Sequence, residues 1–234
     1  MLTNDVTIAA YPKSGITYLS FLLATARAVT CGLKIRPTFF NIDWLVIDSH
    51  KMQGKDYATI WNDGMGNFIK THNPASNAPN VIYLLRNPYD TLKSYFHFER
   101  QLGNQQTVEA FLEMKIPEWL RHVKSWLIDN RNVTQSIYLI EYEAINEASI
   151  KNLGHMLGFN WGDQALTEAL RKASMDDMGN SERTFSSHNP VYRRFELEFV
   201  RRGKERQVEG FEDYREMIKE RTHETYCAVS RLAV

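Results

Sequence analysis

One short segment near the start of the chain combines residue types that bind an anion. Residues 11–18 read Tyr-Pro-Lys-Ser-Gly-Ile-Thr-Tyr and lie between an apolar run at 6–10 and a stretch at 16–30 with leucines at helical spacing. A strand, a tight turn and a helix in this order present backbone N–H groups at the positive end of the helix, where phosphate or sulfate binds. One cation and two hydroxyls are added by Lys13, Ser14 and Thr17. The alternative is an ordinary strand–helix turn with a surface lysine.

The spacing of this segment differs from that of the ATP-binding P-loop. That loop reads G-x-x-x-x-G-K-[ST], so its lysine follows the last glycine. Here Lys13 precedes Gly15, and no earlier glycine completes the pattern. The spacing therefore argues against an ATP hydrolase.

A second segment places a cation beside an imidazole. Residues 67–72 are predicted to form a short strand that ends in Lys-Thr-His. Because Lys70 and His72 are two residues apart on an extended chain, their side chains point to the same side. Such a pair can combine general-base chemistry with stabilisation of negative charge. A purely structural histidine at a strand end is the alternative.

A third segment places an arginine before a hydroxyl. Residues 80–85 have the apolar pattern of a buried strand, Arg86 follows them, and Ser94 falls two turns into the next predicted helix, 89–101. An arginine and a hydroxyl that converge there would suit a second phosphate, because a guanidinium binds two phosphate oxygens at once. Pairing of Arg86 with a nearby carboxylate is equally compatible with the sequence.

Together these segments resemble the soluble sulfotransferases that use 3′-phosphoadenosine 5′-phosphosulfate (PAPS) as donor. Residues 11–18 are similar to the family's 5′-phosphosulfate loop, YPKSGTTW, and Lys-Thr-His is similar to the strand that carries its catalytic histidine. Residues 81–98, VIYLLRNPYDTLKSYFHF, resemble the 3′-phosphate segment, and residues 199–203 resemble the F-x-R-K-G element that closes over the 3′-phosphate. Four motifs in the family's order are more specific than any one of them.

The resemblance implies a role for each site residue. As catalytic residues, His72 would accept the proton of the acceptor, Lys13 would neutralise the bridging oxygen, and Lys70 would hold the oxygens of the transferring group. Tyr142 and Ser174 match family positions that contact the adenosine. The donor-binding set that the resemblance implies is Lys13, Ser14, Gly15, Ile16, Thr17, Tyr18, Arg86, Ser94, Tyr142, Ser174, Arg201, Arg202 and Gly203.

The chain departs from the family pattern at several of these positions. Ile16 replaces a threonine, Tyr18 replaces a tryptophan, Met175 replaces an aromatic residue, and Arg202 replaces a lysine. After Gly203 the chain reads Lys-Glu-Arg-Gln where the family commonly has Gly-Asp-Trp-Lys. Closure over the donor and the family's C-terminal dimer contact are therefore left open, and a homodimer remains one option.

Composition narrows the class of protein. With 234 residues, 43% of them hydrophobic, the chain suits one domain spanning 1–234, and its formal net charge of zero argues against nucleic acid as the main partner. Cys31 and Cys227 lack metal-ligand spacing, and the sequence shows no acidic cluster near the loop to hold a metal ion. No apolar run approaches the ~20 residues that span a bilayer. The absence of a signal-peptide pattern favours the cytoplasm and no membrane partner.

The order of elements predicts an α/β fold with a central parallel sheet flanked by helices, and the resemblance implies the three-layer, P-loop-nucleotide-kinase-like sulfotransferase fold. The predicted strands are 6–10, 67–72, 80–85 and 136–141. The predicted helices are 16–30, 89–101, 107–129, 146–157, 163–174, 191–201 and 211–230, with Pro117 expected to kink or split the third.

Residues 33–66 are the least regular part of the chain. They contain Phe39, Phe40, Trp44, Tyr57 and Trp61 among Asp, Asn and Gly. These aromatic side chains could line an acceptor pocket or pack in the core, and the sequence favours neither interpretation.

The function that follows is transfer of a sulfuryl group from PAPS to a hydroxyl or amine of a small acceptor, with release of adenosine 3′,5′-bisphosphate (PAP) and without a metal. A P-loop-type small-molecule kinase and a non-catalytic nucleotide-binding protein on the same fold are the alternatives. Transfer to a protein tyrosine or to a sugar is a further option that the sequence leaves open.

Overall fold

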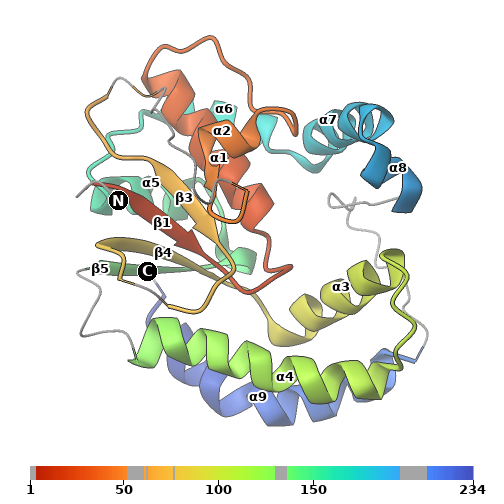
Figure 1. Cartoon of the computed structure of the whole chain (residues 1–234). Helices are drawn as coiled ribbons and strands as arrows, with labels where there is room; N and C mark the ends of the chain where they lie inside the picture. The colour runs from red at the N-terminus through yellow and green to blue at the C-terminus, as the bar shows by residue number, and fades with distance from the viewer. Residues whose placement is uncertain are drawn as a thin grey trace.

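The computed structural model describes residues 4–51, 61, 63–75, 77–129, 136–195 and 210–233, with only the backbone of 194 and 195. Its centre is a parallel sheet of five strands in the order β2-β3-β1-β4-β5 (Figure 1). The strands are β1 (Val6–Ala9), β2 (Ile47–Asp48), β3 (Phe68–Thr71), β4 (Asn80–Leu85) and β5 (Ser136–Glu141). The predicted α/β fold with a central parallel sheet is confirmed.

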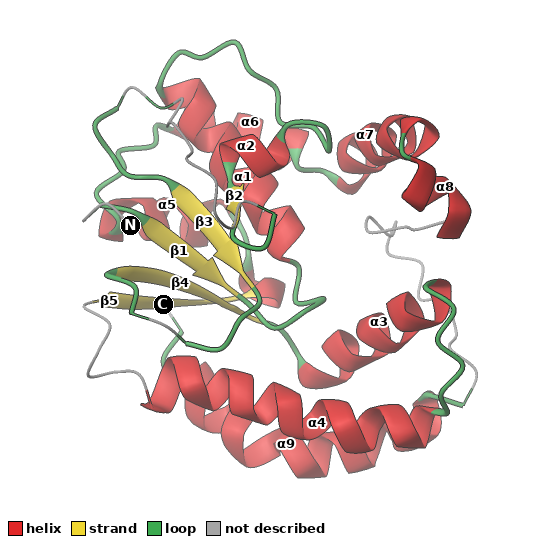
Figure 2. Cartoon of the chain, viewed as in Figure 1, coloured by secondary structure: helices red, strands yellow, loops and turns green. Residues whose placement is uncertain are grey.

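Helices cover both faces of the sheet (Figure 2). They are α1 (Ile16–Thr30), α2 (Ile42–Leu45), α3 (Pro88–Gln101), α4 (Val108–Lys124), α5 (Glu147–Met156), α6 (Asp163–Lys172), α7 (Met175–His188), α8 (Pro190–Phe195) and α9 (Arg215–Ser230). Short turns of other helical types lie at η1 (Ser125–Asp129, a π-helical turn), η2 (Tyr142–Ala144) and η3 (Glu212–Tyr214).

The alternation of side chains along β4 divides the core into two layers. Ile82 and Leu84 pack with α1, α5 and α6, whereas Val81, Tyr83 and Leu85 pack with α3, α4 and α9. Every residue from 81 to 85 is buried. The continuous apolar sequence of β4 is therefore that of a strand covered by helices on both faces of the sheet.

Arg27 of α1 ties the segment before β3 to the core. Its buried guanidinium donates to both oxygens of Asp63 at 2.7 Å, to the carbonyl of Met65 at 3.1 Å and to that of Gly66 at 2.8 Å. The ring of Trp61 lies 4.6 Å from the guanidinium carbon. A buried arginine satisfied in this way fixes where β3 begins, and hence where its far end lies.

The structure corrects the sequence-based elements in three places. The predicted helix 107–129 ends as α4 at Lys124, and its last five residues form the π-helical turn η1; Pro117 lies inside α4, which it does not split. Residues 33–66 contain α2 and β2, which were not predicted because elements of four and two residues leave no periodic signal. Helix α7 was also missed, because few of its residues are apolar. Residues 196–201 of the predicted helix 191–201 lie outside the described part of the chain.

Candidate active site at the carboxyl ends of the strands

The segment between β1 and α1 forms the turn that the sequence predicted. Lys13 and Gly15 both have left-handed backbone conformations, with φ of 69° and 97°, and the N–H of Ser14 donates to the carbonyl of Tyr11 at 3.2 Å. Gly15 is the N-cap residue of α1, and it offers no side chain to cap the helix. The N–H groups of the first turn of α1 therefore face the end of the sheet without a side-chain acceptor from the cap.

A tyrosine ring covers this turn. A Cβ atom on Gly15 would lie 2.4 Å from the ring of Tyr142, so only glycine permits this approach. Tyr142 follows directly after β5, and its ring meets that of Tyr18 edge-on, with 5.9 Å between centroids. Two side chains of the donor-binding set that the resemblance implies thus lie together at the start of α1.

Arg86 contacts the same turn from the end of β4. Its guanidinium donates to the carbonyl of Lys13 at 3.1 Å and lies 4.7 Å from the centroid of the Tyr142 ring. The Nε atom of Arg86 is buried and has no hydrogen-bond partner among the described residues. No ion pair joins Arg86 to a carboxylate in the described part of the chain, so the alternative of a carboxylate partner gains no support.

Helix α3 begins directly after Arg86 for a local reason. The side chain of Asn87 accepts from the N–H of Tyr89 at 3.0 Å and from that of Asp90 at 3.4 Å, and a proline stands at the first helical position. Ser94 lies half-buried on the second turn of this helix. On the third turn, the ring of Phe98 lies 4.4 Å below the ammonium of Lys13.

His72 lies at the end of β3, beside the end of β1. Its Nδ1 is 2.7 Å from the carbonyl oxygen of Ala10, and Ala9 pairs with Thr71 in the sheet. Because a carbonyl only accepts, Nδ1 carries the proton, and Nε2 is the basic nitrogen of the neutral ring. Burial lowers the pKa of His72; the Ala10 carbonyl opposes this shift, and the ammonium of Lys70 adds to it. The geometry thus favours a neutral imidazole able to take a proton.

Lys70 is held by two carboxylates that the sequence analysis did not single out. Its ammonium lies 2.7 Å from an oxygen of Asp43 on α2 and 3.5 Å from one of Asp48 on β2. Lys51 pairs with the other oxygen of Asp43 at 2.5 Å. Although burial raises the pKa of Asp43, Lys70 and Lys51 together hold it below its ordinary value. The carboxylates of Asp43 and Asp48 therefore balance part of the positive charge of Lys70.

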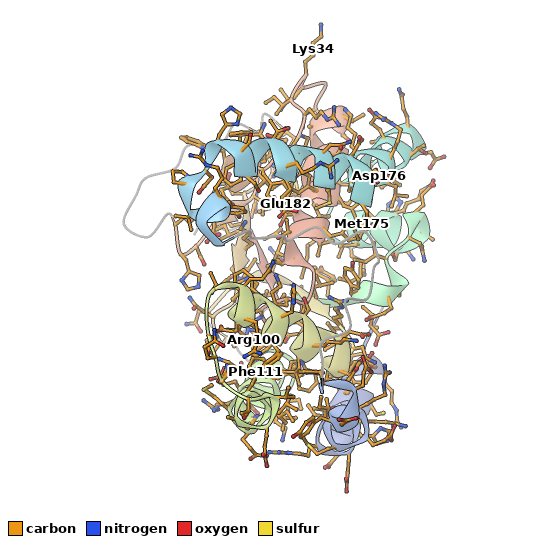
Figure 3. All side chains as sticks on the ribbon, turned by 90° about the vertical axis from the view of Figure 1, so that its right-hand side faces the viewer. Lys34, Arg100, Phe111, Met175, Asp176 and Glu182 are labelled. Atoms are coloured by element: carbon orange, nitrogen blue, oxygen red, sulfur yellow. The ribbon has the colours of Figure 1, made fainter. Side chains whose placement is uncertain are left out.

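Ser174 caps a helix. Its hydroxyl accepts from the N–H of Asp177 at 3.3 Å at the start of α7. The next residue, Met175, packs against the apolar cluster that Tyr18 and Tyr142 also contact. Met175 on α7 and Arg100 on α3 lie on the same side of the molecule, toward which β1 and β3 point (Figures 1 and 3). The remaining predicted donor ligands, Arg201, Arg202 and Gly203, lie outside the described residues.

The aromatic residues of 33–66 lie partly in the core and partly at the surface. Phe39 and Trp61 are buried in the core, whereas Phe40 and Trp44 are 50% and 74% exposed. Tyr57 lies outside the described residues. Core packing therefore accounts for two of these side chains and leaves two at the surface.

No three His, Cys, Asp or Glu side chains in the described ranges gather closely enough to hold a metal ion. None of the helices described here is both long and apolar enough to cross a membrane.

The fold and the site define an α/β protein with a glycine turn between strand and helix at the centre of a parallel sheet, an arginine on one side of it and a histidine on the other. Comparison with known proteins places this class more closely. The model of the sulfotransferase domain matches residues 3–225, so the chain belongs to the sulfotransferase family. It is a PAPS-dependent sulfotransferase, and the comparisons give no support to the kinase alternative.

Relatives and solved structures agree with this assignment. Sulfotransferase 1E1 of Cavia porcellus is 27% identical over 203 residues, which is 77% of this chain and 68% of that protein. Cytosolic sulfotransferase 1 of Danio rerio is 25% identical over 86% of this chain and 75% of its own length. Mouse sulfotransferase SULT7A1 complexed with PAP shares the fold with a TM-score of 0.61 at 19% identity, over 95% of this chain and 84% of that one. Retinol dehydratase in complex with androsterone and PAP gives a TM-score of 0.63 at 19% identity, over 95% and 80%.

Proposed function

We propose that this sulfotransferase uses His72 as the base for sulfuryl transfer at the turn between β1 and α1. The observation that carries the proposal is the contact between His72 Nδ1 and the carbonyl of Ala10, at 2.7 Å. This one bond fixes the tautomer that leaves Nε2 basic, and it ties the ring to the first residue after β1. A base held at the edge of an anion-binding turn lies where an acceptor hydroxyl must lose its proton.

The donor's two charged ends are assigned to different groups. The 5′ end would lie on residues 13–18, where the first N–H groups of α1, the Lys13 ammonium and the hydroxyls of Ser14 and Thr17 favour an anion. The 3′-phosphate would lie against Arg86, whose buried Nε has no partner among the described residues, with Ser94 from α3. Tyr18 and Tyr142 would cover the adenine, and Ser174 would help to position α7 beside it.

The donor supplies an activated sulfuryl group, and the residues of this chain supply the base and the positive charges. The acceptor oxygen forms its bond to sulfur while the bond from sulfur to the bridging oxygen breaks. His72 Nε2 takes the acceptor's proton, and Lys13 balances the charge that develops on the bridging oxygen. An ammonium has three N–H donors. Among the described residues Lys70 donates to Asp43 at 2.7 Å and lies 3.5 Å from Asp48, so at least one donor would remain for an oxygen of the transferring group.

The acceptor is proposed to be a small molecule that bears a hydroxyl or an amine. Support comes from the retinol dehydratase structures, which hold androsterone in one case and retinol in another. The exposed rings of Phe40 and Trp44 would contribute apolar surface to such a site.

We further propose that transfer needs no metal and that the chain works in the cytoplasm, as the name of the Danio rerio relative suggests. We also propose that residues 1–234 form a single domain and that the chain can form a homodimer.

An acceptor screen with radiolabelled PAPS tests the function directly. We expect label to pass to one or more small phenols, alcohols or amines, with the same rate in EDTA, and to be lost in His72→Ala. Peptides with tyrosine and simple sugars are included as competing acceptor classes. A non-catalytic binding protein would bind PAP in calorimetry yet transfer no label to any acceptor, and that result would overturn the proposal.

A further inference from the structure

The main chain that follows His72 is anchored to the end of α4. The indole N–H of Trp126 donates to the carbonyl of Asn73 at 3.0 Å. The N–H of Ala75 donates to the hydroxyl of Ser125 at 3.3 Å, and that hydroxyl donates in turn to the carbonyl of His122 at 2.8 Å. Two hydrogen bonds from one short stretch of helix thus hold the chain within three residues of the proposed base.

His122 adds a buried imidazole to this arrangement. Its Nδ1 lies 2.9 Å from the hydroxyl of Tyr83 on β4, and its Nε2 is buried without a hydrogen bond among the described residues. Burial lowers the pKa of His122 to about 4, the neighbouring His72 adds to this shift, and the main chain at Asn73 and His72 opposes it. A neutral ring that accepts from Tyr83 at Nδ1 carries its proton on Nε2.

The spacing of His122, Ser125 and Trp126 explains how the end of α4 contacts the loop at residues 73–75. Positions 122, 125 and 126 are separated by three and four residues, so their side chains share one helix face. Ser125 opens the π-helical turn η1, and Trp126 follows it within that turn. Single π-helical turns inside helices occur frequently at functional sites. We refer to His122, Ser125 and Trp126 as the α4 clamp.

We propose that the α4 clamp positions the catalytic base. Its members act through the main chain of residues 72–75 and touch no reacting atom, so they are positioning residues. The ring of His72 is fixed on one side by the carbonyl of Ala10, and the clamp fixes the backbone from which that ring projects. A base must lie within hydrogen-bond reach of its proton, and a displacement of about 1 Å can cost roughly 100-fold in rate.

This inference rests on the proposed function of His72, and it is tested by a matched pair of tryptophan substitutions. Trp126→Phe keeps an aromatic ring in the core and removes the donor to Asn73. Trp161→Phe makes the same change in a buried tryptophan of the other core layer, whose indole N–H has no hydrogen bond among the described residues. Both variants therefore carry the same chemical change, and only Trp126→Phe removes a contact to the loop after His72.

We expect Trp126→Phe to lower kcat by about 10-fold or more, with the Kd for PAP unchanged within about twofold. Trp161→Phe should leave both values within about twofold of the parent. Ser125→Ala, a smaller change at the same loop, should lower kcat in the same direction, and it serves if Trp126→Phe does not fold. A normal kcat in folded Trp126→Phe or Ser125→Ala, or an equal loss of kcat in Trp161→Phe, would overturn the proposal.

A second readout needs no turnover. In ¹⁵N NMR of the parent protein, the His72 ring should show the single tautomer with the proton on Nδ1. In Trp126→Phe it should show a mixture of tautomers, and in Trp161→Phe the parent tautomer. If the parent protein transfers no sulfuryl group and binds no PAP, the proposed function fails, while an unchanged His72 tautomer in Trp126→Phe refutes the positioning role by itself.

Discussion

Replacing His72 by asparagine separates the two tasks that the structure gives this residue. The asparagine side-chain amide can still donate to the carbonyl of Ala10, as Nδ1 does at 2.7 Å, but it has no basic nitrogen in place of Nε2. Alanine removes both functions. Comparing the two variants therefore distinguishes a base from a purely structural histidine.

The expected magnitudes follow from these two tasks. Loss of a general base lowers kcat by roughly 10²–10⁴, which corresponds to about 3–5.5 kcal/mol of transition-state stabilisation. Loss of the bond to Ala10 costs about 0.5–1.5 kcal/mol of folding stability. His72→Asn and His72→Ala should thus share the same fall in kcat, while only His72→Ala loses the hydrogen-bond contribution to the melting temperature.

The assay combines kcat at saturating donor with calorimetric Kd values for PAP and with thermal melting. Donor affinity should change by less than about twofold in both variants, because the proposed base does not hold the donor. If His72→Asn keeps the parent kcat, His72 is structural and the base must be sought elsewhere.

The pH dependence adds an independent check on His72. Burial lowers the pKa of this imidazole in the free protein, so an NMR titration should give a midpoint below 6.5. Because the base must be deprotonated, kcat falls as pH falls through the ionisation of His72 in the complex. The anionic donor stabilises the imidazolium, so this fall should occur at a higher pH than in the free protein. A kcat that is independent of pH between 5 and 8 would contradict the assignment.

Four further predictions concern binding and stability. Arg86→Ala should raise the donor KM strongly, and the parent protein should bind PAP more tightly than AMP or ATP, as calorimetry can show. Gly15→Ala forces a methyl group against Tyr142 at a φ of 97° and should weaken PAP binding at least about tenfold. Asp63→Ala leaves the buried Arg27 without its carboxylate and should cost about 3 kcal/mol in a denaturant titration, with PAP affinity retained.

The part of the site around the first turn could be predicted because its determinants are local. A β-branched run, a Pro-Lys-Ser-Gly turn and a helix with apolar spacing follow one another within 25 residues, and β1 and α1 were placed from them nearly to the residue. The same holds for β4 and α3, where Asn87 and Pro88 mark the start of the helix. Roles within the donor site still rest on resemblance.

The partners of Lys70 could not be predicted for a different physical reason. Asp43 and Asp48 lie more than 20 residues earlier in the chain, on elements of four and two residues, so neither periodicity nor spacing connects them to β3. The α4 clamp has only a weak signal in the sequence, namely the spacing that places His122, Ser125 and Trp126 on one helix face. The spacing could not show that this face meets residues 73–75, because that contact depends on how α4 packs against the sheet.

Sheet order explains why motifs far apart in the sequence form one site. β1 is the central strand, β3 lies on one side of it and β4 on the other, and all three run parallel. Their carboxyl ends therefore meet at one edge of the sheet (Figure 1). The turn between β1 and α1 lies in the middle of that edge, with His72 beside it from β3 and Arg86 beside it from β4. A donor that places its 5′ end on the turn and its 3′-phosphate on Arg86 would have its sulfuryl group on the His72 side. In the proposed site the order of strands would thus set the orientation of the donor, because the proposed base and the proposed 3′-phosphate ligand come from opposite neighbours of β1.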